Sequence, residues 1–198
     1  MGATMKRALH SSCKPVNGRA SWLAARIADT AAFTSLTAAE VRGWWLPEAI
    51  PHPVFAAVPI GERYPERRGL LICRHPRALS AEAFKGLRIT TGAETLLAAA
   101  RDLGLLDLVI LGDSALHLGH CTLKELQLTA TQRRRGAPQL RATLPLLDQR
   151  SESPRESVMR VLHVAAGISG RATEEDLRLV RPLRRRCRPM ARRHSTDP

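Results

Sequence analysis

The residues His117, His120 and Cys121 have a spacing that could bind a metal ion. Two imidazoles three positions apart, with a thiol beside the second, can reach one ion from the same end of a helix. A zinc site needs three or four ligands, and no carboxylate or further Cys/His cluster supports this set. Exposed histidines at the end of a helix are therefore the favoured interpretation, and the sequence predicts no metal ligand and no cofactor.

The side-chain types of a hydrolase triad occur close together in the sequence at Asp113, Ser114 and His117. The Gly-x-Ser-x-Gly elbow that exposes a nucleophilic serine is missing, and Ser114 falls inside an apolar helical stretch. An aspartate and a serine that face a neighbouring element are therefore expected here, and we assign no catalytic residue.

The residues Arg133, Arg134 and Arg135 form the densest basic group between residues 31 and 150. Arginines of this kind contact phosphate oxygens in nucleic-acid complexes. They also occur at solvated helix ends, where a cation interacts favourably with the helix dipole. No aromatic residue accompanies them to stack on a base. The solvated end is favoured, and contact with nucleic acid is the functional alternative.

Sequence patterns typical of helices occur on both sides of these candidate site residues. Thr37 with Glu40 reads as a capping box that opens a short helix ending at Gly43, and Thr122 with Glu125 reads as a second box. A long apolar region from residue 91 to Gly119 predicts two buried helices interrupted by Gly104. Leu123, Leu126 and Ala130 are expected to point inward from the helix that follows the second box, and a further helix is expected after residues 136–138, ending near Asp148. Trp44, Trp45 and Phe55 are expected in the core.

Two apolar runs at residues 54–58 and 70–73 are bounded by proline, glycine and charged residues, as strands are, and residues 87–90 are expected to form a third strand. A helix-rich half follows these runs. The sequence therefore predicts an α+β fold, with a small sheet of about three strands followed by packed helices and with disordered ends.

Five segments in a fixed order carry a resemblance to a known family. They are residues 31–39 (AAFTSLTAA), 43–47 (GWWLP), 86–91 (GLRITT) with 94–97 (ETLL), 111–116 (LGDSAL), and 151–154 (SESP) with 156–157 (ES). The chain resembles actinobacterial proteins in which an abortive-infection-type (type IV toxin-antitoxin) antitoxin-like region precedes an endonuclease-like domain related to very-short-patch repair nucleases. The resemblance implies a non-catalytic antitoxin-like or regulatory module whose partner is a toxin protein or DNA.

The same resemblance implies a Mg²⁺-dependent DNA endonuclease, for which converging carboxylates are needed. Glu156 matches the helix glutamate of that domain, but the later acidic positions find no counterpart after Gly170. The winged helix with which relatives begin is not recognisable in residues 1–30. An inactive, frameshifted remnant of an endonuclease is therefore the alternative function.

The predicted domain organisation follows from these segments. Residues 1–30 are poorly structured, residues 31–150 form the antitoxin-like domain, and residues 151–169 are the first helix of an incomplete nuclease-like domain. Residues 170–198 form a disordered arginine-rich tail, because a segment with so few bulky apolar residues cannot offset the entropy of ordering. A shift of one base near residues 168–170 permits a reading that resembles the missing strands, which favours a frameshift.

The chain has 198 residues and a formal net charge of +13. The last 28 residues hold nine arginines against four acids, a net charge of +5, which leaves +8 for the first 170. A positive charge favours a polyanionic partner. Four separated cysteines without a Cys-x-x-Cys pair favour a reducing, cytoplasmic setting, and no apolar stretch is long enough to span a membrane. The oligomeric state is not indicated.

Overall fold

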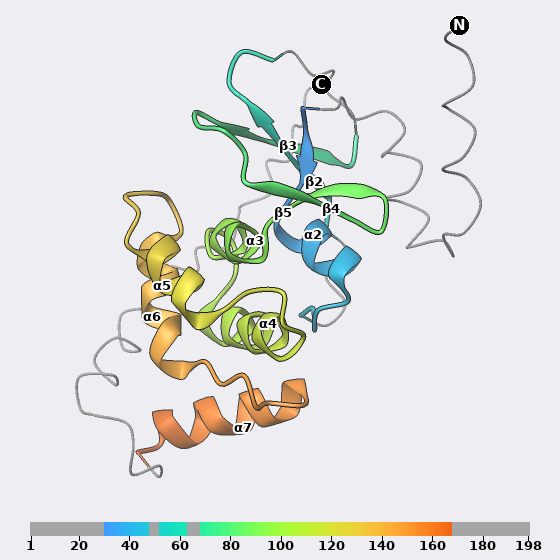
Figure 1. Ribbon diagram of the computed structural model, residues 1–198. Coiled ribbons are helices and arrows are strands. Elements are labelled where there is room, and N and C mark those ends of the chain that lie inside the picture. Colours follow the sequence, from blue (N-terminus) through green and yellow to red (C-terminus); the bar gives the residue numbers. More distant parts are fainter. Residues whose placement is uncertain (1–29, 48–51, 63–67, 168–198) are drawn as a thin grey trace, which may run out of the picture.

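The computed structural model describes residues 30–47, 52–62 and 68–167 of the chain. In these residues a mixed sheet lies at one end of the molecule and a stack of helices extends away from it (Figure 1). The predicted α+β class is confirmed, with five strands in place of about three. The strands are β1 (Ala32–Phe33), β2 (Val54–Pro59), β3 (Leu70–His75), β4 (Ala81–Phe84) and β5 (Leu87–Thr90). The helices are α2 (Ser35–Arg42), α3 (Gly92–Ala99), α4 (Leu105–His117), α5 (Leu123–Ala130), α6 (Ala137–Thr143) and α7 (Pro154–Ala165), with a 3₁₀ turn η1 (Leu144–Leu146) after α6.

The sheet has the strand order β3-β2-β1-β5-β4. The pairs β3–β2 and β1–β5 are parallel, and the pairs β2–β1 and β5–β4 are antiparallel. The two strands missing from the sequence-based prediction have weak signals. β1 has two residues, and β4 exposes Glu82 and Ala83, so neither forms an apolar run. β4 and β5 are joined by Lys85 and Gly86, both with positive φ, which is the backbone twist that a two-residue hairpin requires.

Helix α2 begins earlier than its predicted capping box. Its N-cap is Thr34, and Thr37 is an interior, buried residue of the helix. The Thr37 hydroxyl accepts a hydrogen bond from the Phe55 amide of β2 at 2.9 Å, so it joins the helix to the sheet instead of capping the helix. The predicted end is confirmed, because Gly43 adopts the left-handed conformation that closes many helices.

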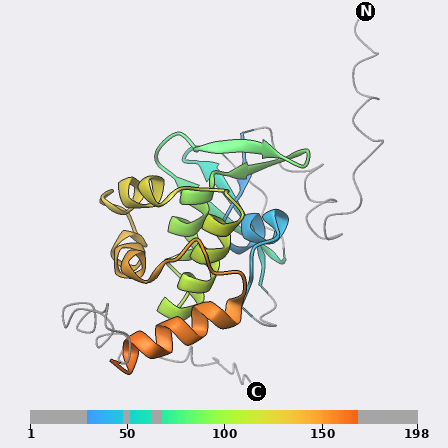
Figure 2. The same ribbon diagram turned by 60° about the horizontal axis from the view of Figure 1, so that its bottom comes forward.

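The core lies between α2, α3, α4, α5 and α6. Leu108 and Leu111 are fully buried, as the near all-round apolarity of residues 105–118 predicts, and Leu96 of α3 is fully buried as well. Trp44 and Phe55 are also buried, whereas Trp45 is only half-buried. Figure 2 shows the helices gathered below the sheet, with α7 across the far end.

The second capping box is confirmed at the start of α5. The Thr122 hydroxyl accepts from the Glu125 amide at 3.2 Å, and the Glu125 carboxylate accepts from the Thr122 amide at 2.7 Å. Leu126 and Ala130 are buried, but the prediction for Leu123 is wrong, because its side chain is 43% exposed in the first turn. The expected helix after residue 136 is α6, which tightens into η1 before Asp148.

Helix α7 is fixed to α4 by a buried polar network around Asp113. The Asp113 carboxylate accepts hydrogen bonds from the Ser157 hydroxyl at 2.5 Å and from the Asp148 amide at 2.7 Å, and it pairs with the Arg160 guanidinium. Burial raises the pKa of Asp113, and these hydrogen bonds oppose that rise. A helix is therefore present within the predicted range 151–169, from Pro154 to Ala165, and it packs on α4.

None of the helices in the described ranges has the length and hydrophobicity needed to cross a membrane. The predictions for residues 1–29 and for the arginine-rich tail 170–198 lie outside the described residues.

Candidate functional site

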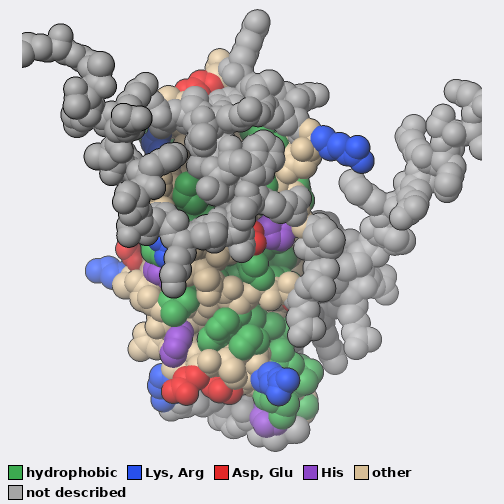
Figure 3. Space-filling model, turned by 90° about the vertical axis from the view of Figure 1, so that its right-hand side faces the viewer, with side chains coloured by type: hydrophobic (Ala, Val, Ile, Leu, Met, Phe, Trp, Pro, Cys, Tyr) green, Lys and Arg blue, Asp and Glu red, His purple; other side chains and the backbone are tan. Residues whose placement is uncertain are grey.

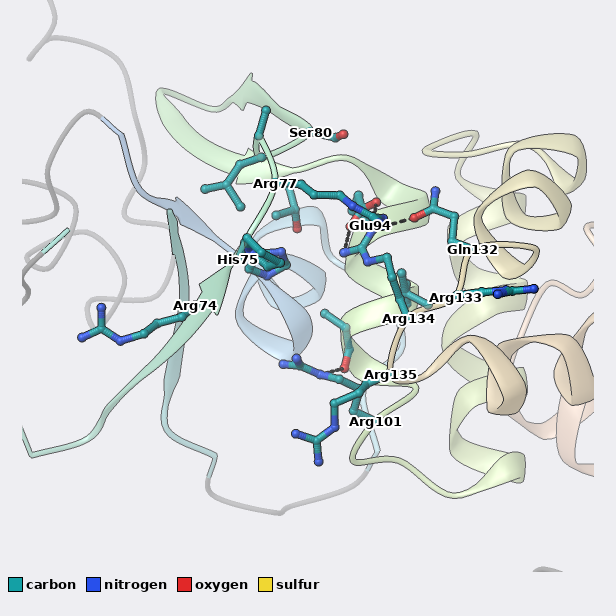
Figure 4. A pocket seen from close by; sticks show the side chains of 16 residues that line it. Arg74, His75, Arg77, Ser80, Glu94, Arg101, Gln132, Arg133, Arg134 and Arg135 are labelled. Atoms are coloured by element: carbon teal, nitrogen blue, oxygen red, sulfur yellow. Dashed lines mark hydrogen bonds and ion pairs between the residues drawn. The ribbon is translucent and has the colours of Figure 1, made fainter. Parts of the chain in front are cut away.

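The largest concentration of arginine in the described residues lines a cavity of about 510 Å³ beside helix α3 (Figure 4). We call it the arginine cavity. Its lining residues are Arg74, His75, Pro76, Arg77, Ala78, Leu79, Ser80, Thr90, Glu94, Leu97, Ala98, Arg101, Gln132, Arg133, Arg134 and Arg135. Six arginines face one glutamate, a formal net charge of +5 with His75 neutral. The volume lies in the range of small-ligand pockets, about 300–1,000 Å³.

Three segments that are far apart in the sequence build the cavity. The connection between β3 and β4 forms one wall, α3 forms the floor, and the loop between α5 and α6 forms the other wall (Figure 4). The start of α3 is fixed to the sheet because the hydroxyls of Thr90 and Thr95 lie 2.8 Å apart and share a hydrogen bond. Gly136 lets the α5–α6 loop approach α3 closely, since it has a φ of 90° and a Cβ there would overlap the Leu97 carbonyl oxygen.

Arg134 is held in one orientation at the centre of the cavity. Its Nη1 and Nη2 atoms donate to the two carboxylate oxygens of Glu94 at 2.6 and 2.7 Å. Nη1 also donates to the Gln132 side-chain oxygen at 2.9 Å. The exposed fractions of the Arg134 and Glu94 side chains are 23% and 14%. A bidentate pair shielded to this degree fixes the guanidinium plane more firmly than an exposed contact does.

The other arginines of the cavity differ in the hydrogen bonds and ion pairs that their side chains form. Arg74 donates to the Glu62 carbonyl oxygen at 2.9 Å, and Arg101 contacts the Cys73 sulfur at 3.3 Å. Arg77, Arg133 and Arg135 are exposed, and none of them makes a hydrogen bond or ion pair with another residue in the described ranges. Figure 4 shows Arg77 reaching from its wall toward Glu94 and Arg134. Uncompensated guanidinium groups on opposite walls create a positive potential that attracts anions.

His75 adds a neutral polar group to the cavity. Burial lowers the pKa of its imidazole below the usual value, and the charge of Arg134 lowers it further. Its Nε2 atom is buried and has no hydrogen-bond partner among the described residues. A buried polar atom left unsatisfied is costly, so this nitrogen lowers the stability of the folded chain.

A second hollow of about 460 Å³ lies on the other side of the α5–α6 loop. It shares Gln132 and the three consecutive arginines with the arginine cavity and adds Arg141, which donates to the Ala130 carbonyl oxygen at 2.6 Å. One arginine-bearing loop therefore stands between two adjoining basic hollows.

The structure places the predicted nucleic-acid contacts Arg133, Arg134 and Arg135 together in this loop. Arg134 pairs with Glu94, so only Arg133 and Arg135 match the expected solvated end. Sequence reasoning missed Arg74, Arg77 and Arg101, because they are far from Arg133, Arg134 and Arg135 in the chain. They come to line the same cavity only in the folded protein. The pattern Arg74-His75-Pro76-Arg77 was the one signal that could have indicated them.

The remaining predicted sites are structural in the described part of the chain. Ser114 accepts a hydrogen bond from the Trp45 amide at 3.0 Å, and Asp113 fixes α7, so both face neighbours as expected. His117 is exposed, but His120 is half-buried and accepts from Trp44 Nε1 at 2.8 Å, which corrects the prediction of two exposed histidines. Burial raises the pKa of Cys121 to about 12.

Glu156 caps the helix that carries it. Its carboxylate accepts from the Glu152 amide and the Ser153 hydroxyl, both at 2.9 Å, and these bonds lower its pKa. Within the described ranges, no three His, Cys, Asp or Glu side chains gather as metal ligands would. The endonuclease remnant therefore stays a prediction, and its missing acidic positions concern residues outside these ranges.

Basic residues are sparse on another face of the molecule. Figure 3 shows that Lys and Arg side chains on this face are separated by hydrophobic and uncharged surface. The arginine cavity and its adjoining hollow, in contrast, are lined by seven arginines and one glutamate.

Comparison with known proteins adds one weak structural likeness. No protein-family model and no curated protein matches the chain. The solved structures include the RV2827C protein from Mycobacterium tuberculosis, to which this chain is similar with a TM-score of 0.45 and 20% sequence identity. The likeness covers 76% of this chain and 58% of that one.

Proposed function

We propose that this protein is a non-catalytic regulatory module of the antitoxin-like type and that it binds the phosphate backbone of a nucleic acid through the arginine cavity and the adjoining hollow. The observation that carries the proposal is the charge of the cavity: six arginines and one glutamate, with Arg77, Arg133 and Arg135 unpaired among the described residues. Unpaired guanidinium groups on opposed walls suit a ligand that brings several negative charges.

A backbone with successive phosphates explains the second hollow better than a small anion does. The α5–α6 loop presents Arg133 and Arg135 between the two hollows, so neighbouring phosphates could lie on either side of it. Arginine contacts of this kind fix the position of a nucleic acid and carry no base specificity. The absence of an aromatic platform in the lining favours backbone recognition over stacking on bases.

A reducing, cytoplasmic setting accompanies the proposal. Cys73 and Cys121 are both buried as free thiols, which suits a compartment where thiols stay reduced.

The double variant Arg77→Gln/Arg135→Gln tests the proposal in the full-length protein. We expect it to bind a fluorescein-labelled single-stranded DNA about tenfold more weakly in an anisotropy titration, since two exposed charge contacts contribute about 0.7 kcal/mol each. The slope of log K against log salt should become shallower by about 1.4, because each neutralised phosphate of a single strand contributes about 0.7.

Arg155→Gln is the matched control, because Arg155 is an exposed arginine of α7 that does not line either hollow. Its affinity and its salt slope should equal those of the wild type. A loss of binding free energy in the control equal to half that of the double variant, or larger, would show that binding follows the number of charges removed and would overturn the proposal.

A further inference from the structure

We infer that the arginine cavity holds the terminal phosphomonoester of a nucleic-acid strand, with the continuing backbone over the α5–α6 loop and in the second hollow. This inference rests on the proposed function and specifies which part of the nucleic acid enters the cavity.

The bonding of Arg134 leaves one side of its guanidinium open for such a group. A guanidinium has five N–H donors. The Glu94 carboxylate accepts one hydrogen bond from Nη1 and one from Nη2, and the Gln132 side-chain oxygen accepts a hydrogen bond from the second proton of Nη1. The Nε proton and the second Nη2 proton form a parallel pair on the adjacent edge, and no described residue accepts from them. Glu94 thus orients Arg134 so that a free bidentate edge remains, and such an edge matches two oxygens of a phosphate.

The charge of the cavity favours a phosphomonoester over a phosphodiester. Figure 4 shows Arg77 reaching from the opposite wall toward Arg134, and Arg77 has no partner in the described ranges. A terminal phosphate carries a charge of about −1.5 to −2 at pH 7 and three strong acceptor oxygens. A backbone phosphodiester has a single charge and only two free oxygens. The guanidinium groups of Arg77 and Arg134 can therefore be satisfied together by the end of a strand more completely than by its interior.

The size and lining of the cavity agree with a strand end. Its volume of about 510 Å³ suits a single nucleotide unit, and a double helix cannot enter it. Pro76, Ala78 and Leu79 give the β3–β4 wall an accessible apolar surface beside the arginines, where the sugar or base of the last nucleotide can lie.

A competition experiment on the full-length protein tests this inference. One single-stranded DNA sequence is prepared with a 5′-phosphate, with a 3′-phosphate and with hydroxyl groups at both ends, and a nucleoside 5′-monophosphate is the fourth competitor. We expect one phosphorylated form to bind about 10- to 30-fold tighter than the hydroxyl form, as one or two added charge-assisted hydrogen-bond pairs imply. The mononucleotide should compete more weakly than that form, because it lacks the backbone that occupies the second hollow.

Two variants connect the preference to the geometry. Arg134→Lys keeps the charge but loses the bidentate edge, so it should remove most of the preference for a phosphorylated end. Glu94→Gln should also reduce the preference, since it loosens the orientation of Arg134. Arg155→Gln should retain the full preference. Circular dichroism of each variant verifies that it is folded.

The outcomes separate the inference from the proposed function. Equal binding of phosphorylated and hydroxyl-ended strands overturns the inference, and the proposed function still stands if Arg77→Gln/Arg135→Gln weakens both. A mononucleotide that competes as well as the phosphorylated strand also overturns it, because the site would then serve a free nucleotide. Failure of every strand to bind would contradict both.

Discussion

Replacing Asp113 with alanine is expected to lower the free energy of unfolding by about 3–5 kcal/mol, the range for breaking a buried ion pair from one side. The Asp113 side chain is fully buried and accepts from Ser157, Asp148 and Arg160. Its removal leaves the Ser157 hydroxyl and the Asp148 amide without an acceptor, and it leaves the Arg160 charge without a partner carboxylate. Urea denaturation followed by circular dichroism measures the change.

Loss of Asp113 should also release α7 from α4. Hydrogen exchange should therefore accelerate in α7 more than in α3, which packs in the core independently of this network. Arg150→Ala is the comparison variant, because Arg150 forms an exposed ion pair with Asp148 only, and its loss should leave the denaturation midpoint unchanged. A midpoint for Asp113→Ala equal to that of Arg150→Ala would contradict the structural role of the network.

Replacing Gly136 with alanine is expected to lower the free energy of unfolding by about 2–4 kcal/mol. The left-handed backbone conformation alone costs an alanine about 1–2 kcal/mol. The remainder arises because the new Cβ would overlap the Leu97 carbonyl oxygen and lie 3.1 Å from Arg101 Cγ. The loop must then move away from α3, and the Arg134–Glu94 pair must lengthen with it. Nucleic-acid affinity should fall together with stability, as thermal melts and anisotropy titrations of the same sample would show.

Gly43→Ala separates the cost of the left-handed backbone from the cost of the overlap between the new Cβ and α3. Gly43 has a φ of 76°, so alanine meets the same conformational cost there, but no atom lies within 4 Å of the added Cβ. It should lose only about 1–2 kcal/mol and keep its affinity for DNA. If Gly136→Ala were no worse than Gly43→Ala, the close approach of the loop to α3 would not matter for the site.

Local signals predicted the elements whose determinants lie within a few residues. The Thr122–Glu125 capping box and the closing Gly43 are such cases, since a helix end is satisfied by its own neighbours. Thr37 fits the same local pattern, yet tertiary structure decides its role, because its hydroxyl accepts from Phe55 across the sheet. Strand β4 was missed because its stability comes from pairing with β5 and from the Lys85-Gly86 turn rather than from an apolar run.

The sequence revealed only the part of the site whose residues are neighbours in the chain. Arg133, Arg134 and Arg135 are adjacent in the chain, so their charge was visible before the fold was known. The partner of Arg134 is Glu94, 40 positions away, and no local pattern connects the two. Arg77 reaches the cavity only because β3 and β4 place their connection opposite the α5–α6 loop. The sequence could therefore indicate a basic group but not a cavity.

Arginine side-chain NMR measures whether the arginines of the cavity contact nucleic-acid phosphates. The full-length protein carries nine further arginines in residues 171–198, so binding alone does not locate the contact. The Nε–Hε resonances of Arg77, Arg134 and Arg135, assigned with single substitutions, should shift when a 5′- or 3′-phosphorylated single strand is added, and Arg155 should not. Shifts confined to the arginines of residues 171–198 would contradict binding of the phosphates in the arginine cavity.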